Sequence, residues 1–287
     1  MYDAQGKYEE AKPLYSRALV ISEAALGPEH PTVAIRLAHL ANLYKTQGLY
    51  DQAEGLYHRA LRISEAALGP KHPVVAIQLT NTASLYVVQG QYAQAEALLQ
   101  RAITITKDAL GDNHSQVALS LNNLAELYRK QDRYAEAMPL YERALSIDEA
   151  ALGLEHHYVA IDLNNLAELY RAQGKYAEAE PLYQRALRIS ETALGSDHPS
   201  VAIRLNNLAS LYDSQGKYAE AEPLYQRAYG IMKASLGLEH PNTRTVLSNY
   251  ADFLMKAELT DKIIPLIPNL KMAFPGNFAK EAESKAE

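Results

Sequence analysis

The chain has 287 residues, 48% of them hydrophobic, with a formal net charge of −6 and no cysteine. That charge offers no basic surface for nucleic acid or an anionic membrane, and the absence of cysteine excludes disulfides and thiolate metal sites. No apolar run approaches the ~18 residues of a membrane-spanning helix, and the opening residues are too polar for a signal peptide. We therefore expect a cytoplasmic chain with enough apolar residues for a continuous core.

A period of 42 residues runs through almost the whole chain without insertion or deletion. It is marked by Gly27, Gly69, Gly111, Gly153, Gly195 and Gly237, and by His30, His72, His114, His156, His198 and His240. A fixed period predicts a solenoid whose units bury their apolar faces by stacking. Since a catalytic site needs unlike residues to converge, and a repeat spreads like residues apart, we expect no enzyme.

The array is expected to begin and end with half-units. Residues 1–26 align with the end of a first helix and a complete second helix, and five full units follow. Residues 242–257 repeat the first-helix pattern once more. We predict a solenoid over residues 1–258 and a C-terminal capping segment over 259–275, where two prolines interrupt the pattern. A disordered tail is expected over 276–287.

Each full unit has the pattern of two helices, as the copy that starts at Ser200 illustrates. Apolar residues follow helical spacing in both halves. We expect Ser200 to cap the first helix and Gly216 to end it. A second helix is expected from Tyr218 to the stop at Gly237, which gives a hairpin of roughly 15 plus 18 residues. Alanines in both halves are expected where the two helices approach closely.

The motif of this unit resembles a known repeat family. The pattern L-x-x-L-A-x-x-Y-x-x-x-G-x-Y-x-x-A-x-x-x-Y-x-x-A is carried by Leu205, Leu208, Ala209, Tyr212, Gly216, Tyr218, Ala221, Tyr225 and Ala228. It resembles the tetratricopeptide repeat (TPR), and the unit, longer than the usual ~34 residues, is similar to arrays of the kinesin light chain type, including bacterial ones. The resemblance implies an all-α, right-handed superhelical solenoid of antiparallel helical hairpins that serves as a protein-binding scaffold.

The periodic histidines are interpreted as turn and packing residues. Equivalent atoms of neighbouring units lie two helix spacings apart, ~16–20 Å, whereas metal ligands lie ~2 Å from the ion. The sequence contains no phosphate-binding loop, zinc-protease motif or nucleophile motif. We therefore expect no metal, no cofactor and no catalytic residue.

The face of the first helices opposite the packing stripe carries the candidate binding residues. In a curved array these helices line the concave side. Asparagine recurs on this face although it is a poor helix former: Asn81, Asn122, Asn123, Asn164, Asn165, Asn206 and Asn207, with Ser210 on the same face. These amides either bind the backbone of an extended peptide or link adjacent helices and stabilise the stack.

Other residues of this face vary between units and would set specificity. Val87 and Val88 are adjacent apolar residues on a polar face, which favours an apolar sub-site. The next two units present charged side chains instead: Glu126, Arg129, Lys130, Glu168 and Arg171. Their alternative role is internal pairing at i,i+3 and i,i+4. If the cations are free, a ligand with an apolar part and an acidic part would fit.

We predict a scaffold that holds a peptide or partner segment in the groove of the first helices. The expected partner is a protein or peptide, with no role for nucleic acid or membrane. The alternative is a passive structural spacer, or a self-association arm of a larger signalling protein that makes its contacts through the open ends of the array.

Overall fold

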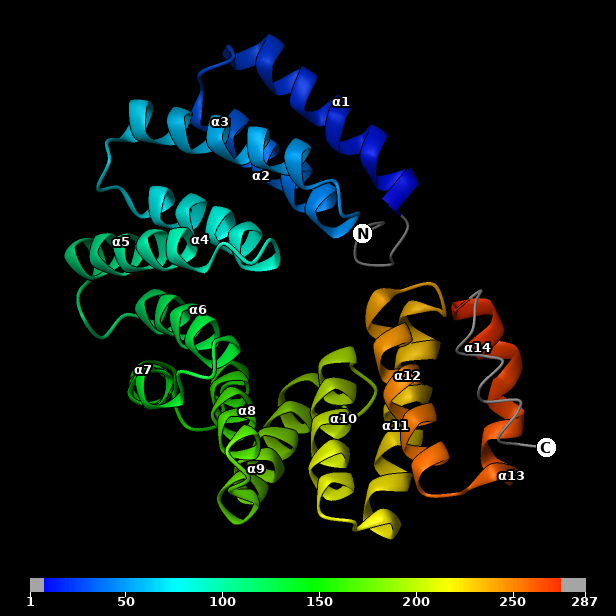
Figure 1. The fold of residues 1–287 in the computed structure, drawn as a ribbon. Coiled ribbons are helices and arrows are strands. Elements are labelled where there is room, and N and C mark those ends of the chain that lie inside the picture. Colours follow the sequence, from blue (N-terminus) through cyan, green and yellow to red (C-terminus); the bar gives the residue numbers. More distant parts are fainter. Residues whose placement is uncertain (1–7, 275–287) are drawn as a thin grey trace. The chain divides into compact units, whose positions relative to one another are not determined.

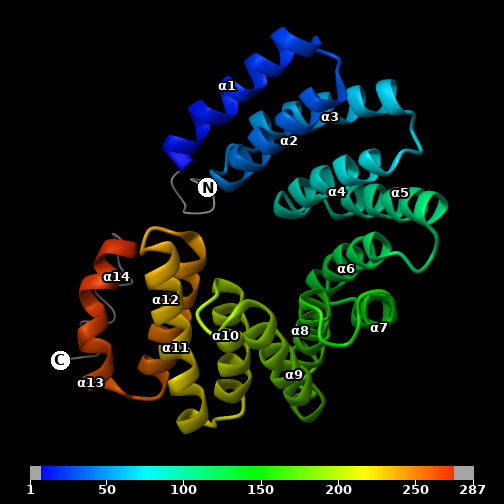
Figure 2. The ribbon, with the colours of Figure 1, turned by 180° about the vertical axis from the view of Figure 1, so that it is seen from behind.

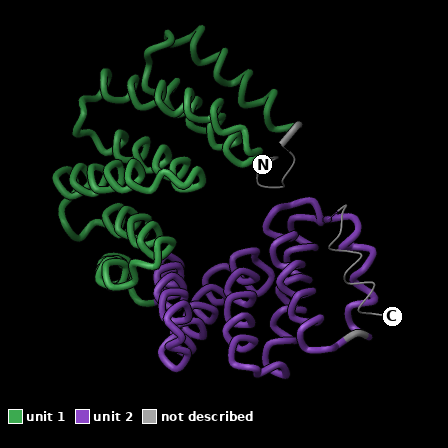
Figure 3. Tube along the Cα trace, in the orientation of Figure 1, with its two compact units in different colours: residues 1–3, 7–154 green, residues 4–6, 155–287 purple. Residues whose placement is uncertain are grey.

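The computed structural model describes residues 8–274, which divide into two compact units that meet in the sequence between Leu154 and Glu155 (Figure 3). The first unit contains α1 (Tyr8–Leu26), α2 (Pro31–Thr46), α3 (Tyr50–Leu68), α4 (Pro73–Val88), α5 (Tyr92–Leu110), α6 (Ser115–Lys130) and α7 (Tyr134–Leu152). The second contains α8 (His157–Ala172), α9 (Tyr176–Leu194), α10 (Pro199–Ser214), α11 (Tyr218–Leu236), α12 (Pro241–Lys256), α13 (Thr260–Ile263), the 3-10 turn η2 (Ile264–Leu266) and α14 (Ile267–Ala273). Over these residues every regular element is a helix, so the all-α prediction is confirmed.

Consecutive helices pack in pairs inside each unit (Figure 1, Figure 2). The pairs are α2 with α3, α4 with α5 and α6 with α7 in the first unit, and α8 with α9 and α10 with α11 in the second. A first helix has 16 residues and a second helix has 19, close to the expected lengths. Within the described part of the chain, no helix is both long and apolar enough to cross a bilayer.

The same positions form the core of each hairpin. In the α2–α3 hairpin, Val33, Ala34 and Leu37 pack with Ala60 and Ile63, and all five are fully buried. Residues 42 positions further on repeat this cluster in the α4–α5 hairpin, and the α6–α7 hairpin repeats it again. The alanines let the two helix axes approach, while burial of each large aliphatic side chain contributes ~1.5–3 kcal/mol.

Left-handed backbone ends the helices at the predicted places. Gly195 follows α9 with φ 87°, and Gly216 follows α10 with φ 72°. Asp132 adopts φ 58° at the end of α6, where the other full units have glycine. Glycine enters this region without a Cβ penalty, and aspartate is among the few other residues that tolerate it.

The repeated histidines cap the first helices. His198 Nδ1 accepts a hydrogen bond from the backbone N–H of Ser200 at 3.1 Å, so the N-cap of α10 is His198 and the prediction of Ser200 is wrong. The same contact starts α2, α4, α6, α8 and α12. The reason is that Pro199 occupies the first helical turn, which suits proline, and His198 has the extended backbone that an N-cap requires.

Replacing His198 with alanine is expected to destabilise the second unit by about 1 kcal/mol, because the Ser200 N–H loses its acceptor. His198→Asn should restore most of this loss, since asparagine is a favourable N-cap. Urea unfolding of the three proteins measures the difference. Equal stabilities of His198→Ala and His198→Asn would show that the imidazole acts by packing and not as a cap.

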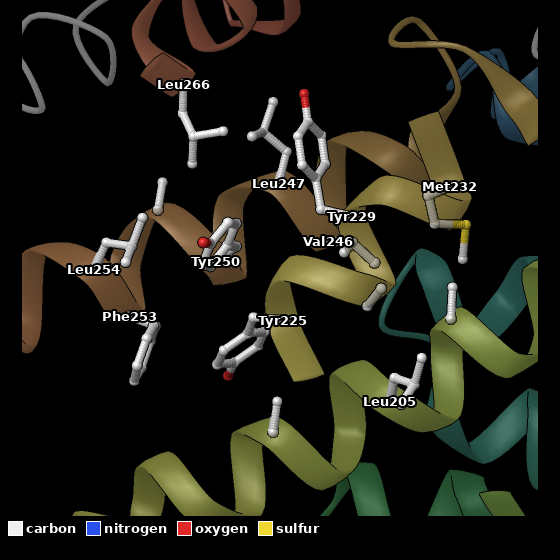
Figure 4. Close-up of a cluster of buried hydrophobic side chains, with 14 of the residues drawn as sticks. Leu205, Tyr225, Tyr229, Met232, Val246, Leu247, Tyr250, Phe253, Leu254 and Leu266 are labelled. Atoms are coloured by element: carbon white, nitrogen blue, oxygen red, sulfur yellow. The ribbon is translucent and has the colours of Figure 1, made fainter. Parts of the chain in front are cut away.

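The described residues end in short helices that pack on α12. Ile263, Leu266, Leu270 and Ala273 join the apolar cluster that α11 and α12 form, part of which is drawn in Figure 4. In this cluster the rings of Tyr225 and Phe253 lie 5.2 Å apart. Residues 259–274 therefore cover α12, in the place where the other units have a second helix. The predicted tail, 276–287, lies outside the described residues.

Candidate functional site

The predicted binding residues lie on four first helices, and many of them line two hollows, one inside each unit. Asn81, Val87 and Val88 lie on α4; Asn122, Asn123, Glu126, Arg129 and Lys130 on α6; Asn164, Asn165, Glu168 and Arg171 on α8; Asn206, Asn207 and Ser210 on α10. We name the cavities by their helices: the α4–α6 hollow of the first unit and the α8–α12 hollow of the second.

The α8–α12 hollow is the larger, with a volume of about 340 Å³. It is lined by Glu168, Arg171, Asn206, Asn207, Ser210, Asp213, Tyr225, Asn249, Asp252, Phe253 and Lys256. The first five of these were predicted. Asn249 continues the asparagine series that the sequence places on this face. Asp213 and Asp252 could have been found from the 42-residue register, since Asp213 occupies the position of Arg171 and Asp252 that of Ser210.

A ladder of asparagine amides connects the first helices of the second unit. Asn207 Nδ2 donates to Asn164 Oδ1 at 3.0 Å, and Asn249 Nδ2 donates to Asn206 Oδ1 at 3.1 Å. Within α10, Asn206 Nδ2 donates to Asn207 Oδ1 at 3.2 Å. Asn164 and Asn206 are buried, so the link between adjacent helices is present. Binding of a ligand backbone by the same amides stays a prediction.

The charged residues of α6 and α8 are paired within their own helices. Arg129 donates to Glu126 through Nε at 2.7 Å and Nη2 at 2.8 Å, and Arg171 Nη2 donates to Glu168 at 2.9 Å. Lys130 Nζ also lies 3.8 Å from Glu126. The internal pairing considered from the sequence is therefore present, and an acidic ligand would have to compete with these carboxylates.

A tyrosine from the second helix completes each of these pairs. Tyr183 donates its hydroxyl to Glu168, and Tyr141 donates to Glu126 at 3.0 Å. Burial raises the pKa of both phenols, and the neighbouring carboxylate raises it further. The result is a Tyr–Glu–Arg network that fixes the polar face of α6 and of α8.

The α10–α11 hairpin does not keep this Glu–Arg pair. Ser210 and Asp213 replace the Glu–Arg pair on α10, and Lys256 Nζ of α12 contacts Asp213 Oδ1 at 2.8 Å. The α8–α12 hollow thus has three carboxylates, Glu168, Asp213 and Asp252, against two cations, Arg171 and Lys256. Its surface is polar and of mixed charge.

The α4–α6 hollow has a volume of about 150 Å³ and is less polar. It is lined by Thr80, Ser84, Val87, Leu99, Asn123, Glu126, Leu127 and Lys130. The α4–α5 hairpin lacks the Tyr–Glu–Arg network, because Leu99, Ser84 and Val87 occupy the positions of Tyr141, Glu126 and Arg129. All three replacements are shorter side chains.

Several predicted residues do not line either hollow. Val88 is exposed on α4, Asn122 is buried in α6, and the ladder residue Asn164 is buried in α8. Asn81, Arg129 and Asn165 are half-buried on α4, α6 and α8. Over residues 8–274, no three His, Asp or Glu side chains gather where they could hold a metal ion.

Comparison with known proteins adds a family and a fold. A family model described as tetratricopeptide repeat matches residues 1–66, 35–108, 79–150 and 158–234. The chain is similar to the crystal structure of BtubC (BKLC) from P. vanneervenii, with 24% identity, a TM-score of 0.63, and coverage of 83% of this chain and 94% of that one. It is also similar to the crystal structure of the nearly identical TPR-like repeats of a putative kinesin light chain from Podospora anserina, with 27% identity, a TM-score of 0.57, and coverage of 72% and 98%. A comparison with curated proteins finds no match.

Proposed function

Because the chain belongs to the tetratricopeptide repeat family, whose fold implies a protein–protein interaction scaffold, we propose that its first helices bind an extended segment of a partner protein. Repeats of this family are generally non-catalytic. The two hollows are the places on the first helices where such a segment would be held. A cytoplasmic location stays a prediction.

One observation carries the proposal: the lining residues change from unit to unit while the packing residues do not. The buried alanine of the first helix is constant at Ala125, Ala167 and Ala209. The lining position one residue further is Ser84, Glu126, Glu168, Ser210 or Asp252. Packing fixes the first position, whereas the second is free to differ and therefore to distinguish ligands.

The α8–α12 hollow suits a polar stretch of the partner. Asn206, Asn207 and Asn249 line it, and beyond the bonds of the ladder a primary amide has a further donor and acceptor for a peptide backbone. The mixed charges of its lining favour polar side chains of the ligand. Attraction of an acidic side chain by Arg171 remains part of the proposal, at reduced strength because Glu168 already pairs with that guanidinium.

The α4–α6 hollow suits one apolar side chain of the partner. Its volume is below the ~300–1,000 Å³ of pockets that take a whole small molecule. Val87, Leu99 and Leu127 form its apolar wall. A side chain buried there would supply the hydrophobic anchor that peptide-binding surfaces commonly need.

Replacing Val87 with aspartate is expected to weaken partner peptides about tenfold or more, because the apolar contact is replaced by a charge that must be desolvated. The matched control is Val88→Asp, which adds the same charge at an exposed neighbour that does not line the hollow. Peptides are selected from a random library on the unmodified chain and titrated against both variants by fluorescence anisotropy.

Peptides that bind all three proteins equally, at unchanged thermal stability, would place the interaction elsewhere. If no peptide binds and the chain instead changes size with concentration, the spacer or self-association role would replace the proposed one.

A further inference from the structure

Three polar side chains outside the two hollows meet between α3 and α4 in the first unit. Glu54 and His58 lie one turn apart on α3, with Oε1 of the carboxylate 3.9 Å from Nε2 of the imidazole. Tyr86 of α4 reaches both of them. Its hydroxyl donates to Glu54 Oε1 at 3.2 Å and lies 3.0 Å from His58 Nε2. One nitrogen and two oxygens therefore form a small triangle across the joint between two hairpins.

The size of this triangle suits a bound metal ion. Nitrogen and oxygen ligands lie ~2.0–2.2 Å from Zn²⁺, so two ligands of one ion are about 3–4 Å apart, depending on the angle at the ion. All three sides of the triangle fall in that range. Imidazole nitrogen and carboxylate oxygen are ordinary ligands of Zn²⁺ and Cu²⁺. The phenol oxygen has a lone pair that makes it the third donor.

Later helix pairs show what this trio replaces. Between α9 and α10, Gln184 Nε2 donates to Glu180 at 3.2 Å and to the Tyr212 hydroxyl at 3.1 Å. The α5–α6 pair also has glutamine at this position, Gln100. Glutamine thus satisfies the packing and the hydrogen bonds, but its amide nitrogen is a donor without a lone pair for a metal. In the α3–α4 pair His58 supplies that lone pair.

The carboxylate of Glu54 also lacks the basic partner that its equivalents have. In two later helix pairs a cation holds the equivalent carboxylate: Arg133 with Glu96 at 2.8 Å and Lys217 with Glu180 at 3.4 Å. Gln91 occupies the position of these two cations in the α3–α4 pair. Within the described part of the chain, no lysine or arginine pairs with Glu54. The trio therefore carries a negative charge while His58 is neutral, and it attracts a cation.

We propose that Glu54, His58 and Tyr86 bind a divalent transition-metal ion, with water in its remaining coordination positions. His58 would bind through Nε2, in the tautomer that carries its proton on Nδ1. Glu54 supplies Oε1 and the negative charge, and Tyr86 supplies its phenol oxygen. Cu²⁺ should bind more tightly than Zn²⁺, following the general order of affinities. Mg²⁺ and Ca²⁺ should bind poorly, because they prefer oxygen ligands throughout.

His58 differs from the repeated histidines, which the 42-residue period keeps apart. It lies outside that series, and its two partners come from the same face of α3 and from α4. The side chains of His58 and Glu54 are 53% and 32% exposed, so an ion can enter from solvent. Once bound, the ion would join the α2–α3 hairpin to the next one and stabilise the first unit.

The test titrates the full chain, freed of metal by a chelator, with Zn²⁺ and with Cu²⁺ in a calorimeter. We expect one site that His58→Gln weakens about tenfold or more, since a ligand is lost. This variant has the residue of the later helix pairs and keeps their hydrogen bonds. The matched control is His39→Asn, which removes an exposed histidine of α2 and likewise has the residue of the other units. It should bind both ions as the unmodified chain does.

Two further variants test the chemistry of the site. Gln91→Lys keeps all three donors but restores a basic partner for Glu54, so it should weaken both ions several-fold. Tyr86→Phe should also weaken them several-fold, because the phenol oxygen is removed. Saturating Zn²⁺ should raise the urea midpoint of the unmodified chain and leave that of His58→Gln unchanged.

Equal binding by His58→Gln and the unmodified chain, or equal losses in the His58 and His39 variants, would overturn the proposal. Unchanged binding in Tyr86→Phe would overturn the assignment of the phenol as a ligand. An unchanged urea midpoint at saturating Zn²⁺ would overturn the link between the hairpins. In metal-free buffer, His58→Gln should bind partner peptides as the unmodified chain does, which separates a failure here from a failure of the hollows as binding sites.

Discussion

Replacing Tyr183 with alanine is expected to lower the free energy of unfolding of the second unit by about 3–5 kcal/mol. The Tyr183 ring is fully buried in a cluster with Ala167, Ala179 and Leu208, and its hydroxyl holds Glu168. The substitution leaves a cavity between α8 and α10 and removes the donor from the carboxylate. Because neighbouring hairpins stabilise one another, hydrogen exchange should accelerate in α10 as well as in α8 and α9.

The control is Tyr158→Ala, which removes the same ring from a position in α8 where the side chain is 46% exposed. It should change stability by less than 1 kcal/mol, as do most surface substitutions (about 0.5 kcal/mol). Urea unfolding followed by circular dichroism compares the two variants. A loss of similar size in both, or exchange that accelerates only in α9, would contradict the described packing.

The array should lose stability steeply in alkaline solution. Burial raises the pKa of Tyr57, Tyr141, Tyr183 and Tyr225, and for Tyr225 the value is about 12. An unfolded tyrosine titrates near ~10. Since the folded pKa is raised, the stabilisation is fully present below pH ~10 and is lost as the pH rises towards the folded values.

Each such tyrosine contributes a slope of up to ~1.4 kcal/mol per pH unit, so the two in each unit together give up to about 3 kcal/mol per pH unit above pH ~10. Urea midpoints measured from pH 8 upwards, together with tyrosinate absorbance of the folded protein, check this. Tyr183→Phe should reduce the slope of the second unit. A midpoint that does not change with pH, or complete titration of the tyrosines before unfolding, would be inconsistent with their burial.

Much of the fold could be predicted because the repeat states the same information several times. The period is read directly from the sequence. Local steric preferences then explain the helix ends at Gly195 and Gly216 and the left-handed backbone of Asp132. The cap at His198 could not be read with the same ease, because Ser200 is a commoner N-cap residue and only the geometry shows which side chain reaches the backbone N–H.

The sequence predicted which helix face carries the candidate site. The hydrogen bonds between that face and other helices were seen only in the structure. Helical spacing placed Asn206, Glu168 and Arg171 on the first helices. It could not show that the Tyr183 hydroxyl, from the second helix, donates a hydrogen bond to Glu168. The burial of Arg204 was likewise seen only in the structure. It is buried, and this burial lowers its pKa to about 10, while the charge of Asp162 acts in the opposite direction.

The asparagine ladder has a consequence for how such a chain changes length. The first asparagine of one unit accepts from the second asparagine of the next, as in Asn164 with Asn207 and Asn206 with Asn249. Donor and acceptor are therefore encoded side by side in Asn206 and Asn207, which link α10 to the first helices on both sides of it. A gene duplication or deletion of one such unit would bring a matching donor and acceptor to the new junction without any further mutation. The number of units can thus vary in evolution while the joints between them are preserved.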